Sequence, residues 1–269
     1  MRPHQWVKNS LLFVAPFLGG QCNLTHYSIL FFPFIAFSLL ASSGCLLNDQ
    51  LDQESDKKHP LKCLRPIARG SLSVPAAGRW VCYLLLLSFG IALILTPSIL
   101  PMMWIYTAGV LCYNFVFKKI PVLDVFFLAL FYPLRISLGA VALPLQEETW
   151  LLSASYFFFL SLAFAKRASE KVEFPECNNV FVRPLQIELL FLLGLLSAPI
   201  SIFIWIMGPY WKHQNPHHWL GLLIIYAILS RIWILVPQKR IHGDPLGFIL
   251  KDPFSYYVGI VFFIVLIAL

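Results

Sequence analysis

The chain has 269 residues, of which 59% are apolar and 12% are charged. Soluble domains contain roughly 45–50% apolar and about 25% charged residues, so this composition excludes an ordinary soluble fold. The formal net charge of +7 raises the question of a nucleic-acid partner, but the positions of the Lys and Arg residues indicate membrane topology instead.

Apolar stretches of about 20 residues, the length at which a helix crosses a bilayer, recur along the chain. We expect an all-α polytopic membrane protein with nine transmembrane helices, near residues 10–21, 28–47, 80–96, 99–117, 122–144, 150–166, 185–209, 218–237 and 253–269. Neither end carries a long polar segment. We therefore expect one integral membrane domain over residues 1–269, without a soluble domain, a cleavable signal or a tail.

The loops between these spans differ in charge. When successive loops are assigned alternately to the two sides of the membrane, one side holds nearly all of the loop Lys and Arg residues, and the other side holds only Lys212. Such a bias sets the orientation of membrane proteins, so we expect the basic loops and the N-terminus to be cytoplasmic. An odd number of spans then places the C-terminus outside.

Acidic residues concentrate where the second span ends, in the string NDQLDQESD at residues 48–56, which holds four of the 13 acidic residues. Asn48, Asp52 and Asp56 follow one another at i, i+4 and i+8, and Asp49 precedes Asp52 and Asp56 by three and seven residues. If the span continues as a helix, all four therefore share one face. Carboxylate and amide oxygens without His or Cys suit Mg²⁺.

A basic run, KKHPLKCLRPIARG at residues 57–70, follows this string directly. A metal beside cationic side chains is how proteins hold a polyphosphate. The simpler interpretation of the acidic string is a solvated helix end, and that of the basic run is a cytoplasmic loop. They do not explain why four carboxylate or amide groups share one face beside the cations.

The whole run resembles the first signature of the UbiA superfamily of intramembrane prenyltransferases, NDxxDxxxD followed by Arg-Pro and a small-residue-Gly turn. Asn48, Asp52 and Asp56 fill this pattern, and Arg65 and Gly70 stand at the later positions. The resemblance extends over essentially the whole chain. It implies an all-helical bundle of nine spans around a central cavity.

The next segment distinguishes branches of this superfamily. Most aromatic prenyltransferases carry a second DxxxD repeat, whereas residues 112–140 contain only Asp124 as an acid. The chain is similar instead to the decaprenyl-phosphate phosphoribosyltransferase branch, in which a Tyr, a Lys, an Asp and an intramembrane Arg recur in the order matched by Tyr113, Lys118, Asp124 and Arg135. The strings RPHQWVKN, AKRASE and DPLGFILKDP also resemble that branch.

This resemblance implies transfer of 5-phosphoribose from phosphoribosyl pyrophosphate to a polyprenyl phosphate of the lipid bilayer, in a bacterial inner membrane, with no nucleic-acid partner. It implies Mg²⁺ bound by Asn48, Asp49, Asp52 and Asp56. The catalytic residues expected are Asp52, Asp56, Lys118 and Asp124. The substrate-binding residues expected are Lys62, Arg65, Tyr113, Lys118, Asp124, Arg135, Lys166 and Arg167. The acceptor is already an anion, so no general base is required.

Arg135 lies about 16 Å beyond Asp124 along the fifth expected span, at 1.5 Å per residue. A guanidinium at that depth costs at least about 2.5–3.5 kcal/mol, so it should face the cavity and have an anionic partner. That partner is either a substrate phosphate or a structural one, Asp124 or an acid of the first motif. Lys166 and Glu170 stand at i, i+4, and this pair is also compatible with helix-end electrostatics alone.

Other polar residues have simpler interpretations. Arg231 lies near a cytoplasmic helix end, where its side chain can reach the surface. Asp244 and Asp252, each followed by Pro, are typical of turns and helix starts. The histidines of WKHQNPHHW at residues 211–219 are interpreted as polar loop residues. The six cysteines show no CxxC pair or metal-ligand spacing, so we interpret them as small packing residues.

Two other functions remain open. Transfer of a prenyl group from its pyrophosphate to an aromatic or other small acceptor uses the same first motif, although the missing DxxxD counts against it. A transporter or channel is compatible with intramembrane charge. Against it, the charges concentrate at one face, and no inverted repeat of Gly- or Pro-broken spans is evident.

Overall fold

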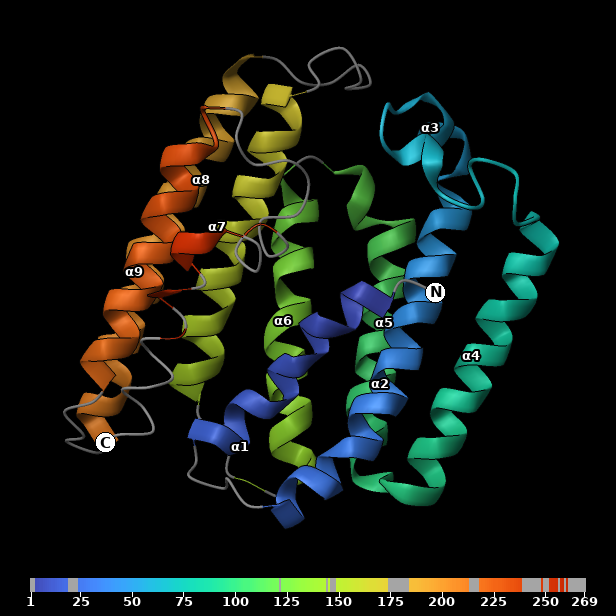
Figure 1. Ribbon diagram of the computed structural model, residues 1–269, viewed down its shortest axis with the longest axis horizontal. Coiled ribbons are helices and arrows are strands. Elements are labelled where there is room, and N and C mark those ends of the chain that lie inside the picture. Colours follow the sequence, from blue (N-terminus) through green and yellow to red (C-terminus); the bar gives the residue numbers. More distant parts are fainter. Residues whose placement is uncertain are drawn as a thin grey trace. The chain divides into compact units, whose positions relative to one another are not determined.

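The computed structural model describes residues 3–18, 24–120, 122–143, 145, 149–173, 184–212, 218–238, 248, 252–255, 257–258 and 260. Over these residues all regular secondary structure is helical, as expected (Figure 1). The chain packs as two compact units. The first comprises Met1–Ile120 and Phe131–Glu147, and the second comprises Pro121–Leu130 and Glu148–Leu269.

The first unit contains two long helices, a shorter one and several brief helical turns. Its elements in chain order are the 3₁₀-helix η1 (Pro3–Phe13), α1 (Val14–Leu18), α2 (Leu24–Leu51), α3 (Gln53–Lys58), η2 (Lys62–Leu64), α4 (Val74–Leu95), η3 (Pro97–Ile99), α5 (Leu100–Phe115) and η4 (Phe117–Lys119). Helix α6 (Leu123–Ala142) begins in the second unit and ends in the first. The second unit also contains α7 (Thr149–Glu173), α8 (Pro184–Lys212) and α9 (His218–Leu235).

Among the described residues, six helical segments are long and apolar enough to cross a membrane, and each coincides with an expected span. They are Ser28–Leu51, Val74–Leu95, Pro97–Lys119, Leu123–Ala142, Thr149–Val172 and Ile187–Gly208. The eighth expected span, 218–237, is helical as α9, with an apolar part at Tyr226–Leu235. The ninth, 253–269, lies mostly outside the described residues, so the count of nine stays a prediction.

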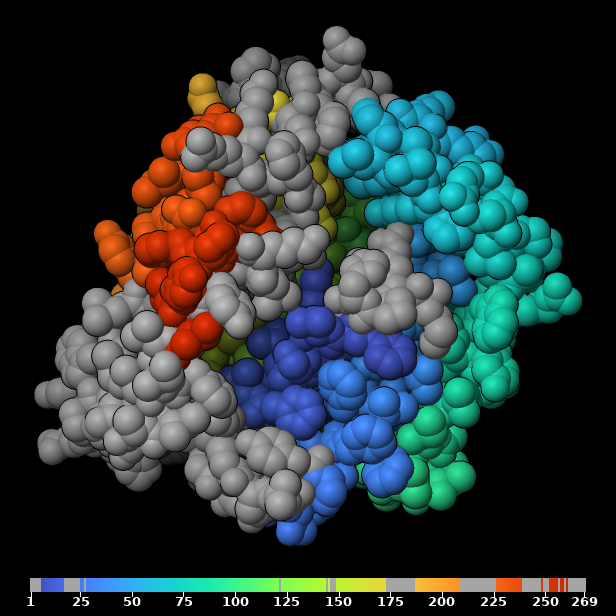
Figure 2. Space-filling view, viewed as in Figure 1, coloured from blue at the N-terminus to red at the C-terminus, as the bar shows by residue number. Residues whose placement is uncertain are grey.

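The first expected span, 10–21, is described only in part and stays a prediction. Its described part consists of the end of η1 and the short α1 and is not among the segments long enough to cross. Polar side chains hold η1 along α2, because Trp6 Nε1 donates to Ser42 Oγ (2.9 Å) and Asn9 Nδ2 donates to Ser38 Oγ (3.0 Å). Part of η1 remains on the surface seen in Figure 2.

Small residues allow the helices of each unit to approach closely, as in other membrane proteins. In the first unit, Ser88 of α4 donates to the carbonyl of Ala36 in α2 (2.7 Å). In the second, Ser161 of α7 donates to the carbonyl of Gly194 in α8 (2.9 Å). A Cβ at Gly194 would lie 2.0 Å from the Trp233 ring, so only glycine fits there.

The outward faces of several helices are apolar. On α4, Leu86 is 75% exposed and Ile94 is 79% exposed. Such side chains are unfavourable in water and favourable in hydrocarbon, so these faces fit contact with lipid.

The loop between α3 and α4 turns the chain back on itself. The N–H of Arg69 donates to the carbonyl of Arg65 (2.8 Å), and the N–H of Gly70 donates to that of Ile67 (3.1 Å). Gly70 has φ +82°, the left-handed region that favours glycine. Ile67 is fully buried and anchors the loop, which directs Arg65 toward the end of α2.

Candidate active site

The end of α2 differs in one respect from the continuous helix that the sequence predicted. Helix α2 ends at Leu51, Asp52 follows with φ −92° and ψ 1°, and α3 begins at Gln53. The helical backbone hydrogen bonds nevertheless continue, since the N–H of Asp52 donates to the carbonyl of Asn48 (3.0 Å) and the N–H of Asp56 donates to that of Asp52 (2.8 Å). The chain therefore keeps these three residues near one another while it bends at Asp52.

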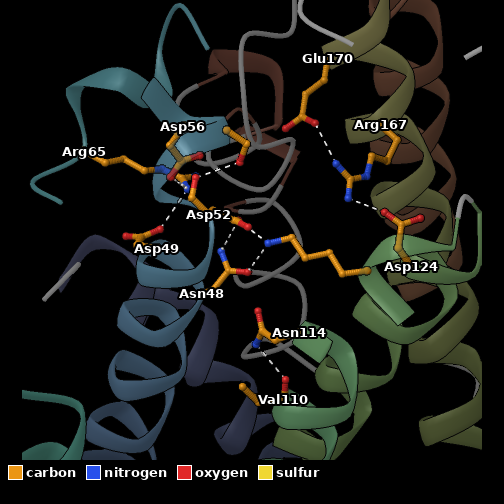
Figure 3. A network of polar contacts seen from close by, with 12 residues as sticks. Asn48, Asp49, Asp52, Asp56, Arg65, Val110, Asn114, Asp124, Arg167 and Glu170 are labelled. Carbon is orange, nitrogen blue, oxygen red and sulfur yellow. Dashed lines mark hydrogen bonds and ion pairs between the residues drawn. The ribbon is translucent and has the colours of Figure 1, made fainter. Parts of the chain in front are cut away.

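The four expected metal ligands divide into two groups, each with its own cation (Figure 3). Lys118 Nζ donates to Asn48 Oδ1 (2.8 Å) and to Asp52 Oδ2, and Asn48 Nδ2 also donates to Asp52 Oδ2 (3.1 Å). Arg65 Nη1 donates to Asp49 Oδ1 (3.0 Å) and to Asp56 Oδ2 (2.7 Å). In this structure Lys118 therefore neutralises one carboxylate, Asp52, and Arg65 neutralises two, Asp49 and Asp56. The predicted role of the four residues as ligands of one metal stays a prediction.

The two groups also differ in access to solvent. The side chains of Asp49 and Asp56 are 8% and 4% exposed, and Arg65 closes over them. The side chains of Asp52 and Lys118 are 20% and 25% exposed. A ligand from solution can therefore reach the Asp52 group more readily than the Arg65 group.

Glu54, the remaining acid of the string, belongs to neither group. It forms an ion pair with Lys57 on the outer surface (2.8 Å). The hydrogen bond and charge of Lys57 hold the pKa of Glu54 below its usual value. Glu54 is thus a surface residue of α3.

Within the part of the chain that the structure describes, no group of three or more His, Cys, Asp or Glu side chains could hold a metal by itself. Mg²⁺ often needs only one or two carboxylates, because substrate phosphates and waters complete its coordination. The Asp52 carboxylate and the Asn48 amide oxygen already bind a cation, the Lys118 ammonium. These residues therefore fit Mg²⁺ bound together with a diphosphate.

A third charged group lies in the second unit, where α6 begins. Arg167 Nη2 of α7 donates to Asp124 Oδ2, and Arg167 Nη1 donates to Glu170 Oε2 (3.3 Å). The sequence predicted an ion pair between Lys166 and Glu170, but Arg167 is the residue that pairs with Glu170. Lys166 lies beside Arg167 on α7, with a half-buried side chain. Two of the predicted residues, Asp124 and Arg167, are thus brought together.

Arg135 is 8% exposed and lies inside the first unit. Its Nε donates to Asn9 Oδ1 (3.0 Å), its Nη1 to the carbonyl of Phe131, and its Nη2 to the Tyr106 hydroxyl (3.5 Å). Three aromatic rings surround the guanidinium at 5.4 to 5.7 Å, those of Phe37, Tyr106 and Tyr132. Among the described residues it has no acidic partner, so the structural ion pair considered from the sequence is not formed there.

Two further predicted substrate residues lie in the first unit. Tyr113 is buried near the end of α5, with its ring edge-on to Phe131. Lys62 lies in η2, where its backbone N–H donates to His59 Nδ1 (3.4 Å). Neither position tests the predicted role.

The sequence did not single out Asn9 or Asn114. Asn9 lies within RPHQWVKN but is 126 residues from Arg135, so only the fold reveals their contact. Asn114 is buried, and its side-chain oxygen has no hydrogen-bond partner in the described structure. The sequence feature that could have singled out Asn114 is its spacing of four residues from Lys118, because residues four apart in a helix share a face.

Among the remaining predictions, Asp252 is confirmed as a helix-start residue, since its Oδ2 accepts from the N–H of Ser255 (3.0 Å). Arg231 differs from the expectation, because it forms a two-point ion pair with Asp252 (2.8 and 2.9 Å). The hydrogen bond from Arg231, supported by those from Ser255, lowers the pKa of Asp252 to about 2. Asp244, His213 and His217 lie outside the described residues.

A model of the UbiA prenyltransferase family matches residues 11–249. The chain belongs to this family. Since at least six helices of the described part are apolar and long enough to cross a bilayer, this UbiA protein is an integral membrane protein. A UbiA homolog from Archaeoglobus fulgidus bound to DMAPP and Mg²⁺ has the same fold, with a TM-score of 0.75 and 18% identity over 99% of this chain and 96% of that one.

Two similar sequences extend this comparison. The uncharacterized protein y4nM of Sinorhizobium fredii is 35% identical over 96% of this chain and 53% of its own length. A decaprenyl-phosphate phosphoribosyltransferase of Mycobacterium tuberculosis is 35% identical over 63% of this chain and 58% of its own length. This UbiA chain thus spans little more than half the length of these relatives. The second of these similarities confirms the resemblance to the decaprenyl-phosphate phosphoribosyltransferase branch.

Proposed function

We propose that this UbiA protein is a Mg²⁺-dependent transferase that joins 5-phosphoribose from phosphoribosyl pyrophosphate to a polyprenyl phosphate. The observation that carries the proposal is the group formed by Asn48, Asp52 and Lys118, which combines oxygen ligands with a partly exposed cation at the end of α2. This combination suits a diphosphate bound with a metal.

In the proposed reaction, an oxygen of the lipid phosphate forms a bond to C1 of the ribose, and the bond from C1 to the pyrophosphate breaks. Mg²⁺ would neutralise the charge of the departing pyrophosphate. Asn48 and Asp52 would hold the metal, and Lys118 would exchange its present partners for a phosphate oxygen. The buried ion pairs of Arg65 would keep α3 folded against the end of α2.

The remaining predicted residues would act on the other phosphate groups. Arg135 would bind one of them, since its present partners leave its charge unbalanced among the described residues. Lys166 and Arg167, with Asp124, would form a second cationic site. Lys62 and Tyr113 would contact the substrate. The basic loops would face the cytoplasm, where phosphoribosyl pyrophosphate is available.

The likeness to decaprenyl-phosphate phosphoribosyltransferases supports this donor. Prenyl transfer is the alternative, because the chain is also 26% identical over 82% of its length to a digeranylgeranylglyceryl phosphate synthase of Sulfolobus acidocaldarius. Asp124, the single acid of residues 112–140, pairs with Arg167, which leaves no second carboxylate pair in that segment. We therefore favour the phosphoribosyl donor.

A two-donor assay separates these functions. Membranes containing the protein are supplied with polyprenyl phosphate and labelled phosphoribosyl pyrophosphate, or with labelled prenyl pyrophosphate and an aromatic acceptor such as 4-hydroxybenzoate. We expect label from phosphoribosyl pyrophosphate in the lipid fraction, dependent on Mg²⁺ and abolished by excess EDTA. Transfer from prenyl pyrophosphate alone, or full activity in EDTA, would contradict the proposal.

Two matched variants locate this activity at the end of α2. Asp52→Asn should abolish transfer, because it removes the exposed carboxylate while leaving the size and shape of the side chain. Glu54→Gln changes an acid two residues away that belongs to the surface pair with Lys57, and it should retain activity. Equal activity of wild type and Asp52→Asn would remove Asp52 from the site.

A further inference from the structure

Asn114 has an unusual side chain for a buried position of α5. It is 7% exposed, and its Nδ2 donates to the carbonyl of Val110 (2.8 Å). Its Oδ1 is buried without a hydrogen-bond partner. In the described structure only one other buried side-chain atom shares this condition, Thr96 Oγ1.

The orientation of the Asn114 amide is determined by its neighbour. A backbone carbonyl can only accept a hydrogen bond, so the nitrogen of the amide must face Val110. The side-chain oxygen therefore points away from Val110. Figure 3 shows this oxygen directed toward the side on which Asn48 lies. Asn114, Asn48, Asp52 and Lys118 all belong to the first unit.

A buried carbonyl without a partner costs about 1–3 kcal/mol, and such groups in native proteins call for an explanation, such as an ion or a ligand. On the side toward which the Asn114 oxygen points in Figure 3, the oxygens of Asn48 and Asp52 are acceptors. The donors of this group, Lys118 Nζ and Asn48 Nδ2, already donate to Asn48 Oδ1 and Asp52 Oδ2. The partner of Asn114 Oδ1 must therefore be a donor or a cation that enters the site.

We infer that Asn114 Oδ1 is a further oxygen ligand of the divalent cation, bound directly or through one water together with Asn48 and Asp52. The inference rests on the proposed function, because that function places the cation and a diphosphate at this helix end. Side-chain amide oxygens are ordinary ligands of hard cations. The fixed amide orientation means that little reorganisation is needed when the cation binds.

The test measures metal binding, not turnover. Mn²⁺ replaces Mg²⁺, inorganic pyrophosphate is present at saturation, and the free Mn²⁺ signal in electron paramagnetic resonance gives the dissociation constant for purified full-length protein. We expect Asn114→Leu to weaken Mn²⁺ binding at least about tenfold, which corresponds to about 1.4 kcal/mol. Asn114→Asp, which adds charge to the same ligand position, should bind Mn²⁺ at least as tightly as wild type.

Thr96→Val is the matched control, because it removes the other unpartnered buried oxygen, at the far end of α4 from the loop that carries Arg65. It should leave Mn²⁺ binding unchanged. Thermal unfolding without metal verifies that each variant is folded. Unchanged Mn²⁺ affinity in Asn114→Leu, or equal loss in Thr96→Val, would overturn the inference.

The outcomes also separate this inference from the proposed function. If wild type binds Mn²⁺ with pyrophosphate and Asn114→Leu does so equally well, Asn114 is not a ligand, while the two-donor assay still decides the reaction. If Asn114→Leu weakens binding of phosphoribosyl pyrophosphate but not of Mn²⁺, Asn114 contacts the sugar, and the metal assignment is wrong. If wild type itself binds no Mn²⁺, both the inference and the proposed metal dependence fail.

Discussion

Two arginines of the first unit, Arg65 and Arg135, have opposite kinds of partners. Arg65 is partly exposed and bridges two buried carboxylates, Asp49 and Asp56. Arg135 is buried and contacts an amide, a carbonyl, a hydroxyl and aromatic rings, with no acid among the described residues. Among the described residues, the charge of Arg65 is therefore balanced by carboxylates, whereas that of Arg135 is not.

This difference assigns different functions to the two residues. A buried charge whose partner is removed is strongly destabilising, so Arg65 is required for the structure of the α2–α3 corner. A buried arginine held by neutral groups is costly in the free protein and gains when an anion binds. Arg135 is therefore the better candidate for contact with a substrate phosphate.

The largest effect on stability is expected for Arg65→Met. This change leaves Asp49 and Asp56 buried without their shared cation, and it should lower the free energy of unfolding by about 3–5 kcal/mol. Thermal unfolding in detergent measures the loss. Arg69→Met, in the same loop but exposed, should change stability by less than about 0.5 kcal/mol. Similar stability of the two variants would contradict the structural role of Arg65.

The Arg231–Asp252 pair of the second unit extends the comparison to a more exposed arginine, and it should contribute about 1 kcal/mol. The folded pKa of Asp252, about 2, lies below its ordinary value of 3.8. The stabilisation is therefore present above about pH 4 and is lost as the pH falls toward 2. Unfolding temperatures of wild type and Asp252→Asn should converge over that range. A difference that is independent of pH would show that the ion pair is not its source.

The smallest effect on stability is expected for Arg135→Met. It removes a buried charge and leaves only neutral groups without a partner, so stability should stay within about 1 kcal/mol of wild type, or rise. Transfer activity should nevertheless collapse. Arg135→Lys should restore little of it, because an ammonium cannot form two parallel bonds to a phosphate. A large loss of stability in Arg135→Met would indicate a structural role, and unaltered turnover and Michaelis constants would exclude Arg135 from the site.

The sequence predicted the parts of this fold that depend on local properties. Apolar length alone located the six helices that can cross a membrane, and it located α9. The span expected at residues 10–21 stays a prediction, and the contacts by which Trp6 and Asn9 of η1 bind α2 were not predicted. Such contacts depend on which side chains meet after folding.

The site shows the same division. The spacing of Asn48, Asp52 and Asp56 identified the functional region, because a helix places such residues near one another. It could not predict the bend at Asp52 or the separation of the four ligands into two groups. That separation depends on Lys118, which is 66 residues from Asp52, and on Arg65, which the turn at Gly70 folds back. The missing partner of Asn114 Oδ1 is likewise visible only in the packed structure.

The most direct test of the account is an experimental structure of the protein with Mg²⁺ and phosphoribosyl pyrophosphate. We expect diphosphate and metal density beside Asn48 and Asp52, with Lys118 Nζ moved from Asp52 to a phosphate oxygen and the Arg65 ion pairs unchanged. We also expect a phosphate group of a bound substrate to lie against the Arg135 guanidinium. Donor density away from Asp52, with the Lys118–Asp52 contact intact and Arg135 still surrounded only by neutral groups, would contradict the account.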